Sequence, residues 1–120
     1  MEQIQNNKRY DLEERTFKFA KEVAEFCKLL PKTFYNVEYS KQLIRSSSSV
    51  GANYIEANEA LGKKDFEMRI RICRKEAKES SYWLRLLIGT NSQEIAEKGR
   101  ILDSEAIELK KIFSSIIGKK

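Results

Sequence analysis

A run of basic residues at positions 63–78 is the feature of this sequence that most clearly indicates a binding function. The run holds seven basic and three acidic residues, in a chain with a formal net charge of +5. On a helix, five cations of this run and Arg85, about two turns after its end, fall within about 100° of arc. These are Lys64, Arg71, Arg74, Lys75, Lys78 and Arg85. Such a stripe would neutralise the phosphates of RNA or DNA without reading the base sequence.

The same stripe has a simpler interpretation as a solvated helix face. Glu67, Glu76 and Glu79 lie close enough in sequence to form ion pairs with nearby cations. The chain also lacks the interleaved aromatic and basic residues of an RNA-recognition sheet. The sequence leaves both interpretations open.

A second polar group consists of Arg45, Asn53, Glu56 and Glu76. We expect these residues to form a fixed network between two helices, because a buried polar residue must be paired and such pairing fixes the register of a bundle. The rival interpretation is a pair of carboxylates, Glu56 and Glu76, for acid–base catalysis or metal binding. Di-iron bundles use a Glu-x-x-His motif, and this chain has no His.

The absence of His also removes the commonest general base and the commonest zinc ligand. Two Cys cannot supply the four ligands of a structural zinc site. The sequence therefore predicts no metal site, no cofactor and no enzymatic activity.

The two cysteines, Cys27 and Cys73, fall among apolar positions of helical segments, where a free thiol behaves as a small hydrophobe. Positions 1–9 lack the apolar stretch of a signal peptide, and no segment has the roughly 18 apolar residues of a membrane span. We expect a cytoplasmic protein that does not contact membranes.

The elements that position these residues are all helical. Pro31, Gly62 and the turn at 89–91 divide the chain into helices at about 11–30, 36–61, 65–88 and 92–117. Short connections favour an antiparallel up-down-up-down four-helix bundle, with residues 1–120 forming one domain. Asp65 and Ser92 are expected N-caps. The last segment is expected to be one helix through Gly99, although Asp103 and Ser104 could cap a separate one.

An apolar stripe with alternating spacings of four and three residues predicts the core of each helix. The positions are Leu12, Thr16, Phe19, Val23, Phe26 and Leu30; Leu43, Ser47, Val50, Tyr54, Ala57 and Leu61; Phe66, Ile70, Cys73, Ala77, Ser80, Leu84 and Leu87; and Ile95, Gly99, Leu102, Ala106, Leu109, Phe113 and Ile116.

Further apolar residues lie beside these stripes and predict a surface that another subunit covers. On the second and third helices they are Ile44, Ile55, Met68, Ile72, Trp83 and Leu86. Trp is favoured at the centre of interfaces, which supports a homo-oligomer. The alternative is an irregular bundle in which wide stripes bury more of each helix.

Four consecutive serines at 46–49, followed by Val-Gly-Ala, are unusual inside a helix because Ser and Gly lower helix propensity. Small side chains let two backbones approach closely. We expect this run to mark a tight helix–helix contact.

Several of these motifs together resemble a known family. They are Gln-Leu-Ile-Arg-Ser at 42–46, Ser-Val-Gly-Ala-Asn-Tyr-Ile-Glu-Ala at 49–57, Asp-Phe at 65–66, Lys-Glu-Ala at 75–77 and Tyr-Trp-Leu-Arg-Leu-Leu at 82–87. The pattern resembles the bacterial four-helix-bundle proteins encoded in intervening sequences of 23S ribosomal RNA genes, and the resemblance covers most of the chain.

The resemblance implies an up-down bundle that assembles as a homopentamer. It also implies a relationship to the accessory protein of diversity-generating retroelements, a basic pentamer that binds nucleic acid and a reverse transcriptase. This chain carries Ser-Val-Gly-Ala where those accessory proteins tend to carry Ser-Ile-Pro, and its excess charge is smaller.

Two functional hypotheses follow. The first is a non-enzymatic oligomer that binds nucleic acid, RNA in preference to DNA, through the basic stripe of the third helix. The second is a structural or adaptor oligomer whose partners are copies of itself and another protein.

Overall fold

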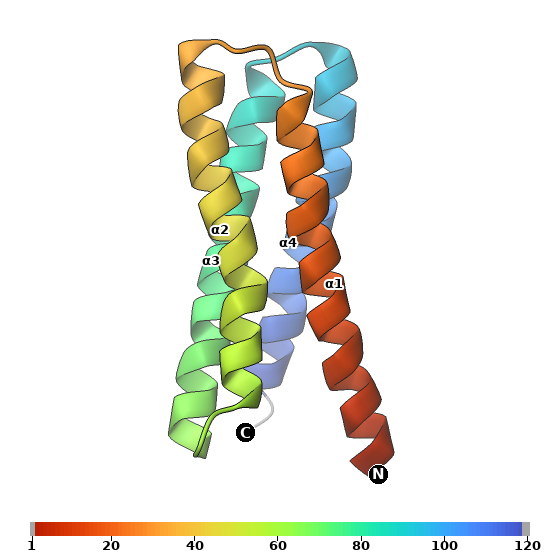
Figure 1. The fold of residues 1–120 in the computed structure, drawn as a ribbon, viewed down its shortest axis with the longest axis vertical. Coiled ribbons are helices and arrows are strands. Elements are labelled where there is room, and N and C mark those ends of the chain that lie inside the picture. The colour runs from red at the N-terminus through yellow and green to blue at the C-terminus, as the bar shows by residue number, and fades with distance from the viewer. Residues whose placement is uncertain (1, 119–120) are drawn as a thin grey trace.

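The protein is a bundle of four α-helices in a computed structural model, which describes the backbone of residues 2–118 and the side chains of residues 11–118 (Figure 1). The helices are α1 Glu2–Lys28, α2 Phe34–Asn58, α3 Lys63–Gly89 and α4 Gln93–Gly118, and the described residues include no strand. The predicted all-α four-helix fold is confirmed. The bundle is elongated, with extents of 47 × 22 × 20 Å.

The connections between the helices lie at alternating ends of the bundle (Figure 1). The α1–α2 and α3–α4 connections lie at one end, and the α2–α3 connection lies at the other end with both termini. α3 packs extensively against α2 and α4, whereas α1 packs less against α2 and least against α4. α1 is therefore the helix that the bundle holds least tightly.

The helix boundaries differ most from the expected ones at the start of α1 and at the end of α2. α1 begins at Glu2 rather than at residue 11, and α2 ends at Asn58, where the Glu59 amide donates to the carbonyl oxygen of Glu56. Leu61 consequently lies in the connection and is 101% exposed, so its assignment to the core is wrong.

Of the two expected N-caps, Ser92 is confirmed and Asp65 is wrong. α3 begins at Lys63 with Gly62 as its N-cap, which places Asp65 inside the first turn. There its carboxylate interacts favourably with the positive end of the helix dipole instead of capping it. The Ser92 hydroxyl oxygen accepts a hydrogen bond from the Ile95 amide at 3.4 Å, so Ser92 caps α4 as expected.

The predicted apolar stripes form the core. All six expected positions of α1 are buried, as are those of α2 except Leu61 and those of α3 except the half-buried Phe66. In α4 the five central positions are buried, and Ile95 and Ile116 at its ends are half-buried. The 3.6-residue period of the sequence is thus the period of burial.

α4 continues unbroken through Gly99, which packs closely against α1 and α3. A Cβ atom added there would lie 2.8 Å from Cγ1 of Ile88 and 3.3 Å from Cζ of Phe26. The missing side chain therefore allows α4 to approach α3 and α1 closely, which offsets the cost of Gly inside a helix.

The serine-rich run of α2 also marks a close approach. Ser46 and Ser80 are buried, and their hydroxyl oxygens are 2.8 Å apart in a hydrogen bond between α2 and α3. A Cβ atom added at Gly51 would lie 3.0 Å from Oγ1 of Thr16 on α1. The expected tight contact is confirmed, and it places α2 between α3 and α1.

A pair of asparagines joins the first turn of α2 to the connection between α3 and α4. The buried Asn36 and the half-buried Asn91 each donate from Nδ2 to the Oδ1 of the other at 2.9 Å. Asn36 also donates to the carbonyl oxygen of Pro31, and Asn91 to that of Leu87. Because the two asparagines are 55 residues apart, their pairing could not be predicted from the sequence.

Candidate nucleic-acid interface

The excess positive charge of the protein is concentrated on α3. This helix holds eight basic and four acidic residues, which accounts for +4 of the formal net charge of +5. The basic and acidic residues balance in α1 and in α2, and α4 holds one more acidic than basic residue. The electrostatic field of the molecule is therefore most positive beside α3.

The six cations singled out in the sequence lie along the outer side of α3, and we call them the basic band: Lys64, Arg71, Arg74, Lys75, Lys78 and Arg85. Five of them are exposed and Arg74 is half-buried. Among the described side chains, no salt bridge engages any member of the band. Their charges face solvent.

Two carboxylates that were expected to pair with the band are directed elsewhere. Arg45 of α2 forms an ion pair with Glu76 at 3.4 Å and donates a hydrogen bond from Nη2 to Oε1 of Glu79 at 2.9 Å. Because Glu76 and Glu79 both interact with Arg45 of α2, neither glutamate forms an ion pair with the basic band on α3.

The structure brings together only part of the expected polar network. Arg45 and Glu76 are in contact, with Glu76 almost fully buried. Asn53 joins the same pair of helices through a different partner, because Arg69 of α3 donates to its Oδ1 at 3.0 Å. Glu56 is exposed and has no salt bridge among the described side chains, so it does not lie beside Glu76 in the core.

A groove between α3 and α4 borders the basic band. It has a volume of about 460 Å³ and is lined by Lys78 and Arg85 of the band and by Lys110 of α4. Lys110 was not expected here, since its helix carries no excess of positive charge and the sequence does not show which residue of α4 faces α3. Three cations from two helices thus surround one groove.

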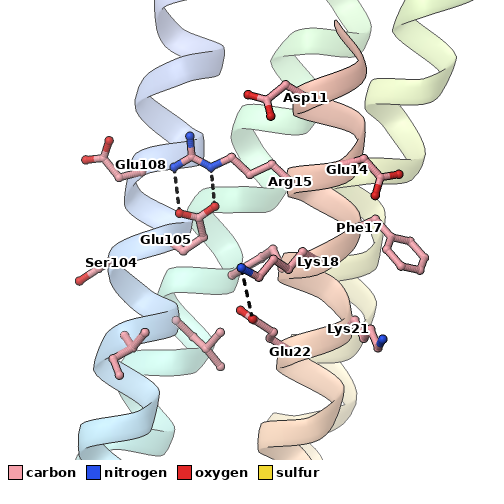
Figure 2. Close-up of a pocket in the computed structure, with 13 residues that line it drawn as sticks. Asp11, Glu14, Arg15, Phe17, Lys18, Lys21, Glu22, Ser104, Glu105 and Glu108 are labelled. Atoms are coloured by element: carbon pink, nitrogen blue, oxygen red, sulfur yellow. Dashed lines mark hydrogen bonds and ion pairs between the residues drawn. The ribbon is translucent and has the colours of Figure 1, made fainter. Parts of the chain in front are cut away.

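A larger groove of about 750 Å³ lies between α1 and α4, and its charge is different (Figure 2). Its lining includes five carboxylates and three cations. Figure 2 shows Arg15 extending from α1 to Glu105 on α4, where Nε and Nη2 donate to the two carboxylate oxygens at 2.7 and 2.9 Å. These hydrogen bonds raise the pKa of Arg15. The acidic surroundings make this groove unsuitable for phosphates.

The six residues expected at an oligomer interface form two separate groups. Ile44 lies in a third groove, between α1 and α2, together with Val37, and helical projection places Ile55 on the same side of α2. We call Val37, Ile44 and Ile55 the α2 patch; all three are exposed.

The other four expected interface residues belong to α3 and form a second group, which we call the α3 patch: Met68, Ile72, Trp83 and Leu86. Met68 is exposed and the other three are half-buried. The Trp83 ring lies 6.1 Å from the ring of Tyr39 on the α3-facing side of α2. The two patches therefore flank α2 on opposite sides and are not one surface.

Two further properties bear on the chemistry. Within the described part of the chain, no three His, Cys, Asp or Glu residues gather in an arrangement that could hold a metal ion. Residues 2–118 also contain no helix with both the length and the apolar character that crossing a bilayer requires.

These features define a class: a small all-α bundle with one strongly basic helix. Residues 8–115 match the family model of the 23S rRNA-intervening sequence protein, and the chain belongs to this family. A similar solved structure is a protein of unknown function from the S23 ribosomal protein family of Bacteroides thetaiotaomicron. It is 33% identical, with a TM-score of 0.80 over 92% of this chain and 97% of that chain. No curated protein matches the chain.

Proposed function

We propose that this protein is a non-enzymatic oligomer that binds RNA through the phosphates that contact its basic band. The observation that carries the proposal is the exposure of the band without ion-pair partners among the described side chains. Unpaired lysines and arginines release counterions when they contact phosphates, which drives binding without base readout. The family description, which refers to an intervening sequence of 23S rRNA, supports RNA over DNA.

The oligomer that we propose is a closed ring of five subunits. The α2 patch and the α3 patch are different surfaces on two sides of one helix. Contact between unlike surfaces of neighbouring subunits is heterologous, and such contacts close into rings when the rotation between subunits allows it. A ring repeats the basic band around its circumference and multiplies the contacts that one RNA can make.

The first test is a fluorescence-anisotropy titration of the protein with a structured RNA and with a DNA duplex of equal length, at several salt concentrations. We expect saturable binding whose affinity falls steeply with salt, by about 0.9 in the logarithmic slope for each phosphate contacted on duplex DNA. Tighter binding of the RNA supports the preference for RNA. Absence of binding at low salt overturns the proposal.

A matched pair of variants tests the band itself. Replacing Arg71, Lys75 and Lys78 with Gln removes three positive charges from the band, and replacing Lys18, Lys21 and Lys28 with Gln removes three from α1. We expect the first variant to bind RNA more weakly and with an affinity that depends less on salt concentration. The second variant should bind nearly as the wild type. Equal losses in both variants would show that net charge, and not the band, attracts RNA.

A protein adaptor without RNA affinity is the second candidate, and the exposed α2 patch favours it. The groove of about 430 Å³ beside this patch is lined by apolar residues, which include Ala24 and Val37, and by three lysines. Ring assembly together with no RNA binding in the titration would support this candidate.

For both candidate functions we propose a cytoplasmic location, because both cysteines are free thiols.

A further inference from the structure

An exposed tyrosine lies within the basic band. On the helical projection of α3, Tyr82 falls between Arg71 and Lys75, inside the arc of the band. Its side chain is 56% exposed, whereas the ring of the next residue, Trp83, is half-buried against the core. The Tyr82 ring thus lies on the charged outer face of α3, and it borders the α3 patch through its contact with Trp83.

The position of this ring is constrained by a second aromatic residue. The Tyr82 ring meets the Trp83 ring edge to face, with centroids 5.1 Å apart and an angle of 76° between the planes. Trp83 in turn lies against Tyr39 of α2. Because contacts of this kind favour one arrangement of the rings, the contact with Trp83 restricts the orientations of the Tyr82 ring before any ligand binds.

The groove between α3 and α4 lies directly beside Tyr82. Tyr82 lines it together with Ala77 of α3 and with Ala106 and Ile107 of α4. Ala77 and Ala106 are fully buried, so the two helices meet there through the smallest side chains. The groove therefore has apolar surfaces, and its volume of about 460 Å³ is in the range of sites for small organic groups, about 300–1,000 Å³.

Cations stand on both sides of the tyrosine. Lys78 precedes Tyr82 by one helical turn and Arg85 follows it by nearly one turn, so the two are about 10 Å apart along the axis of α3. Lys110 of α4 also lines the groove. No described salt bridge engages these three cations. The acidic group that lines the groove, Asp103, accepts a hydrogen bond from the Ser81 hydroxyl.

From this juxtaposition we propose that the α3–α4 groove binds a segment of single-stranded RNA, with one unpaired base stacked on Tyr82 and the flanking phosphates held by Lys78, Arg85 and Lys110. This inference rests on the proposed RNA binding and names its form. Every base has a face that stacks on an aromatic ring, and flanking cations hold the backbone. In a duplex the base faces are covered by neighbouring bases, so the groove discriminates against it.

The test compares Tyr82→Ala and Tyr82→Phe with wild type, using a short oligouridylate that carries one fluorescent adenine analogue and an RNA duplex of equal length. Phe17→Ala is the matched control, because Phe17 is 64% exposed but lies by the carboxylate-rich α1–α4 groove. We expect Tyr82→Ala to weaken single-strand binding about 5- to 100-fold and to abolish quenching of the analogue. Tyr82→Phe and Phe17→Ala should retain both, and binding of the duplex should change little in every variant.

The outcomes separate this inference from the proposed function. If single-strand binding and quenching survive in Tyr82→Ala while neutralisation of the basic band still removes affinity, the stacking site is wrong and the phosphate-binding function stands. If wild type binds neither probe at low salt, both are wrong. Circular dichroism and the oligomeric state of Tyr82→Ala report whether its loss of binding comes from misfolding.

Discussion

At the scale of single residues, Cys73 shows how completely the core of this bundle excludes water. Its side chain is fully buried between neighbouring core residues of α3. Burial raises the pKa of the Cys73 thiol from its ordinary value of 9.0 to about 12, because the thiolate would lose its hydration. Burial also raises the pKa of Cys27, although a hydrogen bond with Ser40 opposes this effect.

The pKa of Cys73 predicts a dependence of stability on pH. Below pH 9.0 the thiol is neutral in both the folded and the unfolded protein, and its burial contributes its full stabilisation. As the pH rises from 9.0 toward 12, the thiol ionises in the unfolded protein but not in the folded one, so this stabilisation is lost. Urea unfolding on both sides of pH 9.0 should show a loss of at most about 1.4 kcal/mol per pH unit from this group. The Cys73→Ala variant should have a lower free energy of unfolding than the wild type, but this free energy should fall less steeply as the pH rises. The Cys27→Ala variant should keep most of the wild-type fall with pH. An identical decline in Cys73→Ala and wild type would contradict the assignment.

At the scale of elements, α1 differs from the other helices in how it is attached. Its packing against α4 is the weakest contact between adjacent helices of the bundle. The paired hydrogen bonds between Arg15 and Glu105 cross this contact (Figure 2). Elements with few buried contacts open at the lowest free energy, so α1 should show the fastest amide hydrogen exchange among the four helices.

A double-mutant cycle with Arg15→Gln and Glu105→Gln measures what this pair contributes. We expect a coupling free energy of about 0.5–1 kcal/mol, because two parallel charge-assisted hydrogen bonds are strong but both side chains remain partly exposed to screening. The exposed pair of Lys28 and Glu25 on α1 is the control, with an expected coupling of about 0.2–0.5 kcal/mol. Urea unfolding at one protein concentration provides the values. A coupling no larger than that of the control would mean that packing alone holds α1.

At the scale of the whole molecule, charge and apolar surface are distributed over different faces. The basic band lies on the outer side of α3, the α1–α4 groove is rich in carboxylates, and the α2 and α3 patches flank α2. On the helical projection of α3, the α3 patch borders the basic band on the side toward α2, and the α3–α4 groove lies on the other side of the band. We therefore expect subunits that assemble through the two patches to leave the α3–α4 groove uncovered. The proposed assembly is therefore compatible with RNA binding at the α3–α4 groove.

The proposed heterologous contact predicts complementation between two defective variants. Ile55→Lys places a charge in the α2 patch, Met68→Lys places one in the α3 patch, and each should dissociate the ring into monomers. A mixture should form dimers, because each variant retains the patch that the other has lost. Light scattering after size-exclusion chromatography measures the masses. Ile101→Lys, on the exposed surface of α4, should assemble as the wild type. A mixture that stays monomeric would exclude this pairing of the patches.

Properties that depend on spacing along one helix could be derived from the sequence. The recurrence of apolar residues every three or four positions predicts the four helices and nearly all core positions, because burial follows the period of the helix. The unbroken stripe through Gly99 predicts one long α4. The failures, Leu61 and Asp65, lie at helix ends, where a few local hydrogen bonds decide the boundary.

Most pairings of side chains between helices were decided by the tertiary structure alone. The sequence grouped Arg45 with Glu76, but it places Arg15, Arg69 and Glu105 only on particular faces of their own helices and not opposite particular partners. The pairing depends on how far each helix is rotated and displaced against its neighbour, and long charged side chains reach several partners with similar energies. The groove that joins Tyr82 to Lys110 has the same origin, because two faces from distant parts of the chain meet there only after the bundle has packed.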